Sequence, residues 1–595
     1  MKFPYGISDF YKLITEGYFY VDRTGRLPMI EEAGEQLLFL RPRRFGKTLL
    51  LSMLENYYDV AKSDEFETLF GQFAIGQNPT PRHNHYLVLK WDFSVVAADG
   101  EPAAIRQALH DHLNARMTIF SHAYRHLLGE KIAFHPTNAI ATFESLMGAV
   151  KTSGYPLYLL IDEYDNFANE VMMGSRGDSP KRYEALLAGE GSLKTVFKAI
   201  KSASAGLWLD RVFITGVSPV VMSDLTSGYN VARNVYLLPA FNDLCGFHEA
   251  EVAAALQQIV AACELPASSA DDALEIMRTF YNGYCFSPSE EQLVYNPTLA
   301  LYFMNHFREE CRSPRQMLDS NLAMDRGKLA YVARLPGGGQ VILDAVNEAP
   351  PLNVRELADR FGVEDILAVR KDPVFMCSLL YYFGVLTFGG QTARGGLILR
   401  IPNLVVRRLY VEQIQTLLLP DLQTQQDGLA AAETFYSIGD LQPLCDFVEQ
   451  RYFRAFDNRD YRWANELTVK TAFLTLLFND TFYIADSEAA LERGYADLSL
   501  ILRPEMRRYQ LLDILIEFKY VALTETRLTR EQARSLSAAE VAALPPVQAK
   551  LAEAKARLPG YRQSLAQRYG EALRLRTYAV VAFGFDRLTW EEVSG

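Results

Sequence analysis

Short apolar runs alternate with amphipathic stretches along the first half of the chain. The apolar runs predict strands near 36–40, 85–96, 155–167 and 207–220. Between them, GKTLLLSMLENYYDV and AIRQALHDHLNARMTIFSHAYRHLL carry apolar residues at helical spacing. Strands that alternate with helices predict an α/β domain over residues 1–285, with a parallel sheet and helices on both faces.

The pattern changes after residue 285. Residues 286–340 are helical and irregular, and this connector ends in the turn LPGGGQ. Residues 341–415 place two helical stretches, VRELADRFG and DPVFMCSLLYYFG, before a glycine-rich hairpin formed by VLTF, GGQTARGG and LILRIP. Helices followed by such a hairpin predict a small module resembling a winged helix.

A linker and a last domain complete the predicted organisation. The stretch LPDLQTQQDG predicts a linker over 416–435. Residues 436–595 then read as an α/β domain with strands at 496–502 and 509–519, a long helical stretch, and the closing strand TYAVVAFGF.

Composition narrows the class of protein. The chain has 595 residues, 49% hydrophobic and 22% charged, as in ordinary globular proteins. No uncharged apolar run is long enough to span a bilayer, and the N-terminus has no signal-peptide core. The six cysteines are far apart, which predicts reduced core thiols in a cytoplasmic protein, with neither disulfides nor zinc.

Charge bears on nucleic-acid binding. The formal net charge of −12 argues mildly against a protein that coats nucleic acid. Residues 501–580, however, hold fourteen Arg and Lys against eight Asp and Glu. This region is either a surface for phosphate backbone or a helix with a solvated charged face.

The stretch LFLRPRRFGKTLLL resembles a phosphate-binding loop. Lys47 and Thr48 follow Gly46 where an apolar run passes into a helix, as in G-x-x-x-x-G-K-[ST]. The first consensus glycine is replaced by Arg41, so the motif is either chance or a loop that works without that glycine. Arginine resists positive φ, so we expect the phosphate cradle to rest on residues 44–48, Arg44 to Thr48.

A second motif supports a nucleotide site. LYLLIDEYD ends an apolar run in Asp162 and Glu163, as in a Walker B strand, where the aspartate holds Mg²⁺ and the glutamate polarises water. Thr215, at the end of the next strand, is either a sensor of the γ-phosphate or a plain strand terminus. Arg43 and Arg44 contact phosphate, contact DNA or pair with acids; the sequence leaves these open.

The C-terminal domain holds a second set of acids. Asp497 opens one strand, and Glu517 and Lys519 lie two apart on the next, so both point to the same side. The order D-x19-E-x-K fits two carboxylates that hold Mg²⁺ and a lysine that orients water at a phosphodiester. The alternative is a solvent-facing strand, against which the apolar setting LLDILIEFKYV argues.

These motifs together resemble the AAA-ATPase-like family that is usually fused to a PD-(D/E)xK nuclease domain. The N-terminal resemblance covers residues 3–300, through FPYGISDFYKLITEGYFYVDRT, LRPRRFGKTLLLSML, LYLLIDEYDN, FITGVSPVVMSDLTSGYN and FYNGYCFS…VYNP; the C-terminal one covers about 460–590. The form RPRRFGK[ST] is characteristic of that family, so Arg41 stands where the family has it. The resemblance implies a restriction-endonuclease-like C-terminal domain.

The resemblance also implies particular site residues. It gives ATP as the ligand of Arg43, Arg44, Phe45 and the rest of the loop, and places Asp22 and Arg23 near the adenine. It adds Glu466 to the nuclease site. It puts Mg²⁺ on the ligands Thr48, Asp162, Asp497 and Glu517. One departure is Arg557, where the family often has glutamine, with Pro559 close behind; another is Ala496 in place of the proline before Asp497.

The leading hypothesis is therefore an ATP-regulated, Mg²⁺-dependent nuclease that acts on DNA in preference to RNA. A role in defence against, or processing of, foreign DNA rests on fold-level analogy. The main alternative is an ATPase-only switch with an inactive nuclease-like domain as scaffold. A helicase motor is disfavoured because no second motor core is found, and self-association stays open.

Overall fold

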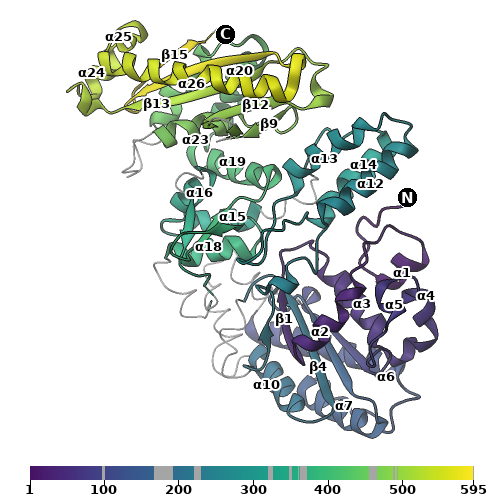
Figure 1. The fold of residues 1–595 in the computed structure, drawn as a ribbon. Coiled ribbons are helices and arrows are strands. Elements are labelled where there is room, and N and C mark those ends of the chain that lie inside the picture. The colour runs from purple at the N-terminus through teal and green to yellow at the C-terminus, as the bar shows by residue number, and fades with distance from the viewer. Residues whose placement is uncertain are drawn as a thin grey trace.

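The computed structural model arranges the chain as three successive parts, each built around its own sheet (Figure 1). It describes residues 1–96, 101–166, 192–219, 229–318, 326–347, 351–358, 361, 372–454, 466–486, 489–491 and 494–593. Within these residues, no helix is long and apolar enough to cross a membrane.

The first sheet is parallel throughout, as its apolar runs predicted. Its strands are β1 (Gln36–Leu40), β2 (Leu87–Asp92), β3 (Leu157–Asp162), β4 (Leu209–Gly216) and β5 (Arg233–Asn234). Their order in space is β2-β3-β4-β1-β5, and every neighbouring pair is parallel. The carboxyl ends of β1, β3 and β4 therefore meet at one edge, which is where ligands bind in open α/β sheets.

Helices cover both faces of this sheet. The larger ones are α3 (Lys47–Tyr58), α6 (Pro102–Ala123), α7 (Ala139–Ser153) and α10 (Ser192–Ser204), beside α1 (Phe10–Thr15), α2 (Leu27–Ala33), α4 (Phe66–Phe70) and α5 (Ala74–Gln77). The step from β1 to β2 crosses the sheet in the opposite direction to the steps from β2 through β3 to β4. Because parallel crossovers are right-handed, α3 lies on one face of the sheet and α6, α7 and α10 lie on the other.

Seven helices form the part between the first and last sheets in the described residues. They are α12 (Glu249–Ala262), α13 (Ser268–Tyr281), α14 (Pro297–Glu310), α15 (Arg326–Arg334), α16 (Gly338–Asn347), α18 (Pro373–Tyr382) and α19 (Leu404–Leu418). A three-stranded antiparallel sheet of β6 (Leu352–Val354), β8 (Leu397–Arg400) and β7 (Thr387–Gln391) accompanies them.

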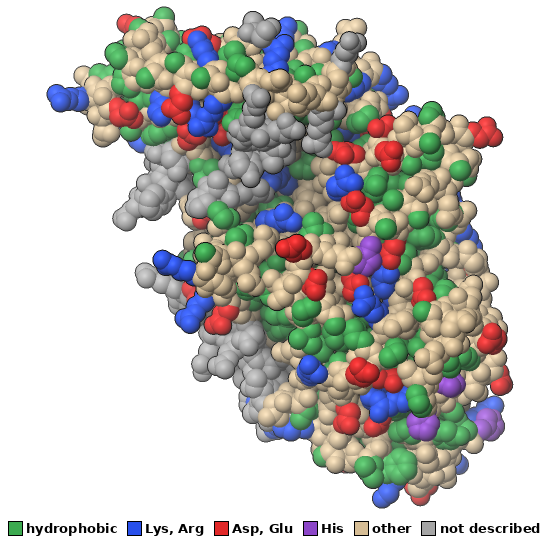
Figure 2. Space-filling view, in the orientation of Figure 1, with side chains coloured by type: hydrophobic (Ala, Val, Ile, Leu, Met, Phe, Trp, Pro, Cys, Tyr) green, Lys and Arg blue, Asp and Glu red, His purple; other side chains and the backbone are tan. Residues whose placement is uncertain are grey.

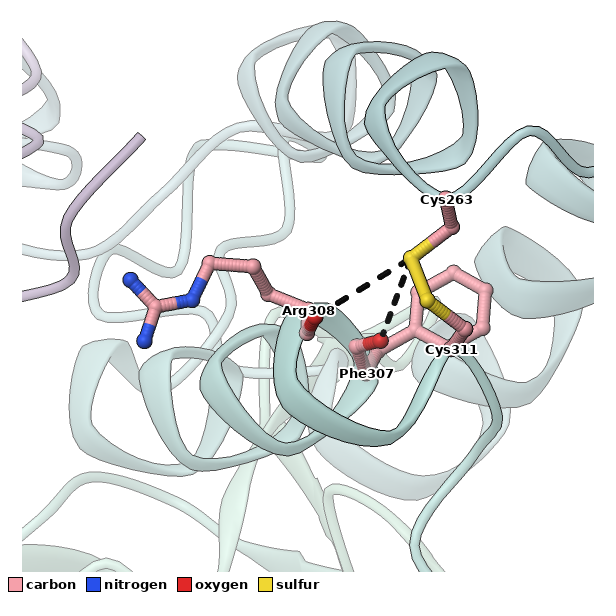
Figure 3. The surroundings of a disulfide bond; sticks show 4 residues. All are labelled: Cys263, Phe307, Arg308 and Cys311. Carbon is pink, nitrogen blue, oxygen red and sulfur yellow. Dashed lines mark hydrogen bonds between the residues drawn. A yellow bond between two sulfur atoms is a disulfide. The ribbon is translucent and has the colours of Figure 1, made fainter.

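A disulfide joins two of these helices, which corrects the expectation that all cysteines are reduced. Cys263 ends α12 and Cys311 ends α14, with their Cα atoms 5.6 Å apart (Figure 3). The two helices pack against each other, so residues 48 apart in sequence meet at one end. Sequence spacing carried no sign of this pairing. The other four cysteines are buried and free, as expected of core thiols.

The middle module keeps the expected hairpin but buries its best helix. The strands β7 and β8 flank GGQTARGG as predicted. The helix predicted at VRELADRFG is not found in its described part: the stretch begins in β6 and continues through residues 355–358 without helical structure, while residues 359, 360 and 362 lie outside the described residues. All of α18 from Phe375 to Tyr382 is buried. The winged-helix assignment stays a prediction, and α18 offers no free face for a ligand.

The predicted linker 416–435 is largely helical, which corrects that expectation. α19 runs to Leu418, and α20 (Leu422–Ile438) starts after a break of three residues, with Asp421 accepting a hydrogen bond from Thr424 N at 2.8 Å as its cap. A Cβ on Gly428 would come within 3.0 Å of Leu476 and Phe447, so this glycine serves close packing instead of flexibility.

The last sheet mixes parallel and antiparallel pairs. Its order is β15-β14-β13-β12-β9, from β9 (Tyr483–Asp486), β12 (Leu498–Leu502), β13 (Asp513–Val521), β14 (Leu575–Phe583) and β15 (Arg587–Glu592). Among these strands, only β13 and β14 pair in parallel. Both strands predicted before the long helix begin two to four residues late here, because turn residues precede them. The sheet packs between α20 and α23 (Glu466–Leu477) on one side and α26 (Pro545–Tyr569) on the other. The smaller elements of this part are β10 (Ala489–Leu491), β11 (Gly494–Ala496), α21 (Gln442–Phe447), α24 (Arg530–Ser535) and α25 (Ala538–Ala542).

Candidate functional site

A cavity of about 490 Å³ opens at the carboxyl edge of the first sheet. Its lining includes the loop from Arg44 to Thr48, together with Glu163. Most of the remaining lining is apolar or aromatic and includes Tyr5, Ile7, Phe19, Val21, Phe247 and Leu301. The volume lies within the range of small-molecule sites, and this lining suits a ligand with a charged end and a flat apolar end.

The loop before α3 confirms that Arg41 avoids positive φ, but it places another arginine, Arg44, in the left-handed region. Gly46 has a φ of 89° and precedes the first turn of α3, and Arg44 has a φ of 66°. Arg41 is absent from the positive-φ positions. The Arg44 carbonyl accepts a hydrogen bond from Thr298 Oγ1 at 2.8 Å, which pins the strained residue to the start of α14. The left-handed turns therefore fall at 44 and 46, next to the helix N-terminus that favours anions.

Arg41 anchors the loop from beneath. Its side chain is 1% exposed and donates to the carbonyls of Tyr236 at 2.9 Å and Phe241 at 2.5 Å. Its guanidinium lies over the rings of Phe39 and Phe286, 4.5 and 4.1 Å from their centroids. Burial lowers its pKa to about 10, which still leaves it charged at neutral pH. The arginine at the missing glycine position thus takes a structural role and leaves ligand binding to later residues.

Lys47 is folded back onto its own loop. Its Nζ donates to the carbonyl oxygens of Arg41 and Pro42, each at 3.0 Å, and the residue is 4% exposed. Burial lowers its pKa, an effect that the carboxylates of Glu163 and Asp162 oppose. Lys47 and Thr48 both line the cavity. A phosphate there would find the ammonium group already desolvated and close by.

Asp162, the last residue of β3, and Glu163, the residue after it, differ in burial and in access to the cavity. Asp162 is 1% exposed, and its Oδ1 accepts hydrogen bonds from Glu163 N at 3.0 Å and Thr215 Oγ1 at 2.6 Å. Glu163 has a φ of 48° and lines the cavity, and burial raises its pKa. Thr215 is fully buried against Asp162, so it orients that carboxylate and does not reach the cavity itself.

Arg43 and Phe45 face away from the main cavity in part. Arg43 donates to Asn166 Oδ1 and lines a small second cavity with Glu163. Phe45 packs its ring edge-on against Tyr284 and Phe286, 4.9 and 5.0 Å between centroids. The segment FYNGYCFS therefore supports the phosphate loop by packing, a role that no chemical argument from sequence had assigned.

Asp22 and Arg23 divide between structure and cavity. Asp22 accepts from the amide of Thr24 and from that of Ala74, at 2.8 and 2.9 Å, and does not line the cavity. Arg23 lines the cavity but is held by Glu251, with two hydrogen bonds of 2.6 and 2.8 Å. The geometry therefore leaves Arg23 as the only one of this pair beside a bound ligand.

A second centre lies in the C-terminal domain around Lys519. Its Nζ is 3.1 Å from Glu517 Oε1, 3.3 Å from Glu466 Oε1 and 4.0 Å from Asp497 Oδ2. The acids come from β13, the start of α23 and the residue before β12. Asp497 also accepts from Phe518 N at 2.8 Å, which locks it to the strand. All four residues predicted for this site are thus brought together.

The carboxylates and the ammonium group at this centre affect one another's pKa values. Glu517 is fully buried, and burial together with Asp497 raises its pKa to about 7. Burial would lower the pKa of Lys519, but the surrounding carboxylates outweigh it and raise that pKa. The second Glu517 oxygen, Oε2, is buried with no hydrogen-bond partner in the described residues. Leaving such an oxygen unmatched is costly unless a cation or water meets it.

The carboxylates fit a hard cation only in part. Oxygen ligands and an unmatched Glu517 Oε2 suit Mg²⁺. Across the described ranges, however, no three His, Cys, Asp or Glu side chains already stand as a metal-binding group. Arg557 Nη1 lies 3.0 Å from Glu517 Oε1, and Lys519 meets the same oxygen. Two cations of the chain therefore meet one oxygen of the carboxylate, and the other oxygen is buried without a partner among the described residues.

Sequence reasoning did not predict the contacts of three residues at these two sites. Thr298 follows the YNP motif, which caps α14 through Asn296, and only the fold brings it to Arg44. Lys328 from α15 lines the small cavity beside Glu163, with its Nζ 4.9 Å from the ring of Phe383. Arg557 was recognised as a departure, but its ion pair with Glu517 needed the structure.

Comparison with known proteins bears on the N-terminal part. Residues 4–226 match the family model described as "Predicted AAA-ATPase", which covers less than half of the chain. A curated relative, described as an uncharacterized protein in the vnfD 5' region of Azotobacter chroococcum mcd 1, is 30% identical over 318 residues. That match covers 52% of this chain, and the chain spans only 53% of the relative's length.

Solved structures resemble the chain only loosely. The Walker-type ATPase PABY2304 of Pyrococcus abyssi shares 15% identity over 66% of this chain and 96% of its own, with a TM-score of 0.41. The ORC1 protein of Aeropyrum pernix, solved in complex with DNA, shares 11% over 67% of this chain and 96% of its own, with a TM-score of 0.25. At such scores the function of this chain has to be argued from its own residues.

Proposed function

We propose that the protein binds and hydrolyses ATP at the cavity beside Lys47, and cleaves phosphodiester bonds of DNA, with Mg²⁺, at the centre around Lys519. The nuclease half rests on one observation above all: three carboxylates from separate elements converge on one lysine amino group, within 4.0 Å. That set matches the demands of phosphodiester hydrolysis, which needs metal-binding acids and a positive group near the reacting phosphate.

At the nucleotide cavity each residue has a distinct task. The amides of residues 44–48 and the N-terminus of α3 hold phosphate oxygens, while Lys47 leaves its loop carbonyls for the β- and γ-phosphates. Thr48 and Asp162 would hold Mg²⁺, which supplies charge neutralisation at the phosphates when bound. Glu163, whose pKa is raised by burial, accepts the proton of the attacking water. The apolar lining of the cavity takes the base.

At the C-terminal centre the strand β13 presents the reacting groups. Asp497 and Glu517, with Glu466, would hold Mg²⁺, which lowers the pKa of water and offsets charge on the scissile phosphate when bound. Lys519 donates hydrogen bonds to the attacking water or to a non-bridging phosphate oxygen. The nearly complete burial of Glu517 and Lys519 keeps bulk water from screening these charges.

A second function is favoured by Arg557. Its guanidinium pairs with Glu517, so the C-terminal domain could be a scaffold in an ATPase-only switch whose metal site is closed. Arg557 is partly exposed, with 49% of its side chain accessible, and can swing away from the carboxylate. This exposure, and the Glu517 oxygen without a partner among the described residues, favour cleavage over the scaffold.

The experiment incubates the protein with linear and supercoiled DNA, with Mg²⁺ or EDTA, and with or without ATP. Nicked or linearised products that require Mg²⁺ support the proposal. ATP turnover without any cleavage, on every substrate, supports the scaffold instead. The P-loop assignment fails if Lys47→Ala binds ATP as tightly as wild type, with Lys62→Ala as the matched control on the same domain.

A further inference from the structure

A groove of about 410 Å³ lies at the end of the last sheet where β13 and β14 begin. Its lining includes three arginines, Arg562, Arg574 and Arg576, beside Leu512, Ala566 and Leu573. Lys and Arg side chains are visible over this domain in Figure 2, including near its end where α26 ends in Figure 1. The groove is separate from both sites described above, and none of the residues that build those sites lines it.

The described part of the chain neutralises the charge of these three arginines only in part. Arg562 makes no ion pair with the described residues. Arg574 Nη2 donates to two backbone carbonyls, of Arg507 at 2.9 Å and Tyr509 at 2.6 Å, which fix its direction without cancelling its charge. Arg576 has only a loose ion pair of 3.6 Å with Glu592. A chain of net charge −12 therefore concentrates positive charge at this place.

The groove and the centre around Lys519 lie along the same two elements. Leu512, at the groove, directly precedes β13 and lies five residues before Glu517 at the centre, roughly 17 Å at ~3.3 Å per residue. On α26, Arg557 at the centre and Ala566 at the groove are nine residues apart, roughly 14 Å at ~1.5 Å per residue. Both measures agree, and they correspond to about four or five nucleotides at ~3.4 Å each.

We propose that this groove binds the phosphate backbone of a nucleic-acid strand whose scissile bond lies beside Lys519. The inference rests on the proposed nuclease function for the position of that strand. Arginine is suited to phosphate because its planar fork donates two hydrogen bonds at once. Three such groups at one end of the site would hold the strand in register without reading its sequence.

The test measures binding by fluorescence anisotropy in EDTA, so that nothing is cut. The probes are a labelled 20-nucleotide DNA strand, its duplex, and RNA of the same sequence. The variant is Arg562→Gln with Arg576→Gln, and Arg574 is kept because it holds two backbone carbonyls. The matched control is Arg527→Gln, an exposed arginine of the same domain outside the groove. Thermal melting establishes that all variants are folded.

We expect the double variant to bind DNA several-fold more weakly. For each phosphate that is no longer neutralised, the slope of log K against log salt should become shallower by about 0.9 for duplex or about 0.7 for single strands. If the double variant, the control and the wild type bind DNA with equal affinity and equal salt dependence, the proposal that this groove binds nucleic acid is wrong. If the double variant weakens RNA alone, the bound strand is RNA. If wild type cuts no DNA in the separate assay with Mg²⁺, but the double variant still loses affinity in EDTA, the groove binds nucleic acid and the proposed nuclease function is wrong.

Discussion

Arg557 Nη1 lies 3.0 Å from the Oε1 atom of Glu517, the buried carboxylate at the centre of the C-terminal sheet. Lys519 meets the same oxygen at 3.1 Å, and the other oxygen of Glu517 has no partner in the described residues. The carboxylate is thus neutralised by the chain at one oxygen only. Whether this domain works on phosphodiesters depends on how readily a metal ion competes for it.

The Arg557→Gln variant should bind divalent cations more tightly. Removing one competing charge from Glu517 favours the metal, and because Arg557 is half exposed the gain is modest, about 2- to 5-fold from an ion pair worth ~0.5–1 kcal/mol. Mn²⁺ binding measured by electron paramagnetic resonance gives the affinity. Arg534→Gln is the control, because Arg534 also pairs with a buried carboxylate of this domain, Asp586. Weaker Mn²⁺ binding by Arg557→Gln would show that the arginine does not compete with the metal.

Restoring the consensus glycine should harm the protein. Arg41→Gly removes the donor to the carbonyls of Tyr236 and Phe241 and the cation between two rings, so we expect a loss on the order of 3 kcal/mol in unfolding free energy. Urea unfolding of the N-terminal domain, with ATP binding as the probe, gives the midpoint from which this loss of stability is measured. Arg44→Gly is the matched control: residue 44 has a φ of 66°, which glycine adopts without strain. Equal stability of both variants would refute the anchoring role.

Thiol counting tests the link between α12 and α14. Under denaturing conditions without reductant, the protein should show four reactive thiols, rising to six after reduction. Reduction should also lower the melting temperature, since a loop of 48 residues closed by a disulfide stabilises by roughly 4 kcal/mol in the chain-entropy estimate. Cys263→Ser with Cys311→Ser should melt like the reduced protein. Six free thiols before reduction would contradict the disulfide.

Stability in EDTA should depend on pH through Glu517. Burial and the neighbouring Asp497 raise its pKa from an ordinary value of 4.5 to about 7 in the folded protein. Between these pH values the folded protein holds a proton that the unfolded chain has released, so stability falls as pH rises through the window. Glu517→Gln cannot ionise. It should therefore melt higher than wild type at pH 8, and this difference should shrink below pH 7; a constant difference across the range would be contrary evidence.

Much of the nucleotide site was accessible from sequence because its determinants are local. The loop, its helix and the acids after β3 are each contiguous, and apolar runs place them at one sheet edge. Arg41 avoids positive φ, as expected of an arginine at that position, whereas the positive φ of Arg44 was not predicted, because arginine disfavours that conformation. What sequence could not supply was Thr298 on Arg44 or Tyr284 on Phe45, since these contacts join segments more than 200 residues apart.

The C-terminal half was predicted less completely. Alternation on β13 placed Glu517 and Lys519 on one face, and the spacing to Asp497 matched a hairpin. The prediction of a linker was wrong because the polar residues in LPDLQTQQDG suit a capped helix as well as a linker. Only the packing of Gly428 against Leu476 and Phe447 decides between these two structures. The disulfide was not predicted because its two cysteines are brought together by helix packing, which no local sequence pattern indicates.

The proposed function requires two separate sites, one that acts on ATP and one that acts on DNA. The most direct measurement follows phosphate release and DNA cleavage in the same Mg²⁺-containing sample for wild type, Lys519→Ala and the control Lys555→Ala, a partly exposed lysine of α26 paired with Glu591. We predict that Lys519→Ala releases phosphate at the wild-type rate but loses DNA cleavage by at least about 100-fold, as general acid–base or electrostatic groups are typically worth. Lys555→Ala should keep both activities. Cleavage by Lys519→Ala at the wild-type rate would refute the assignment of the second site.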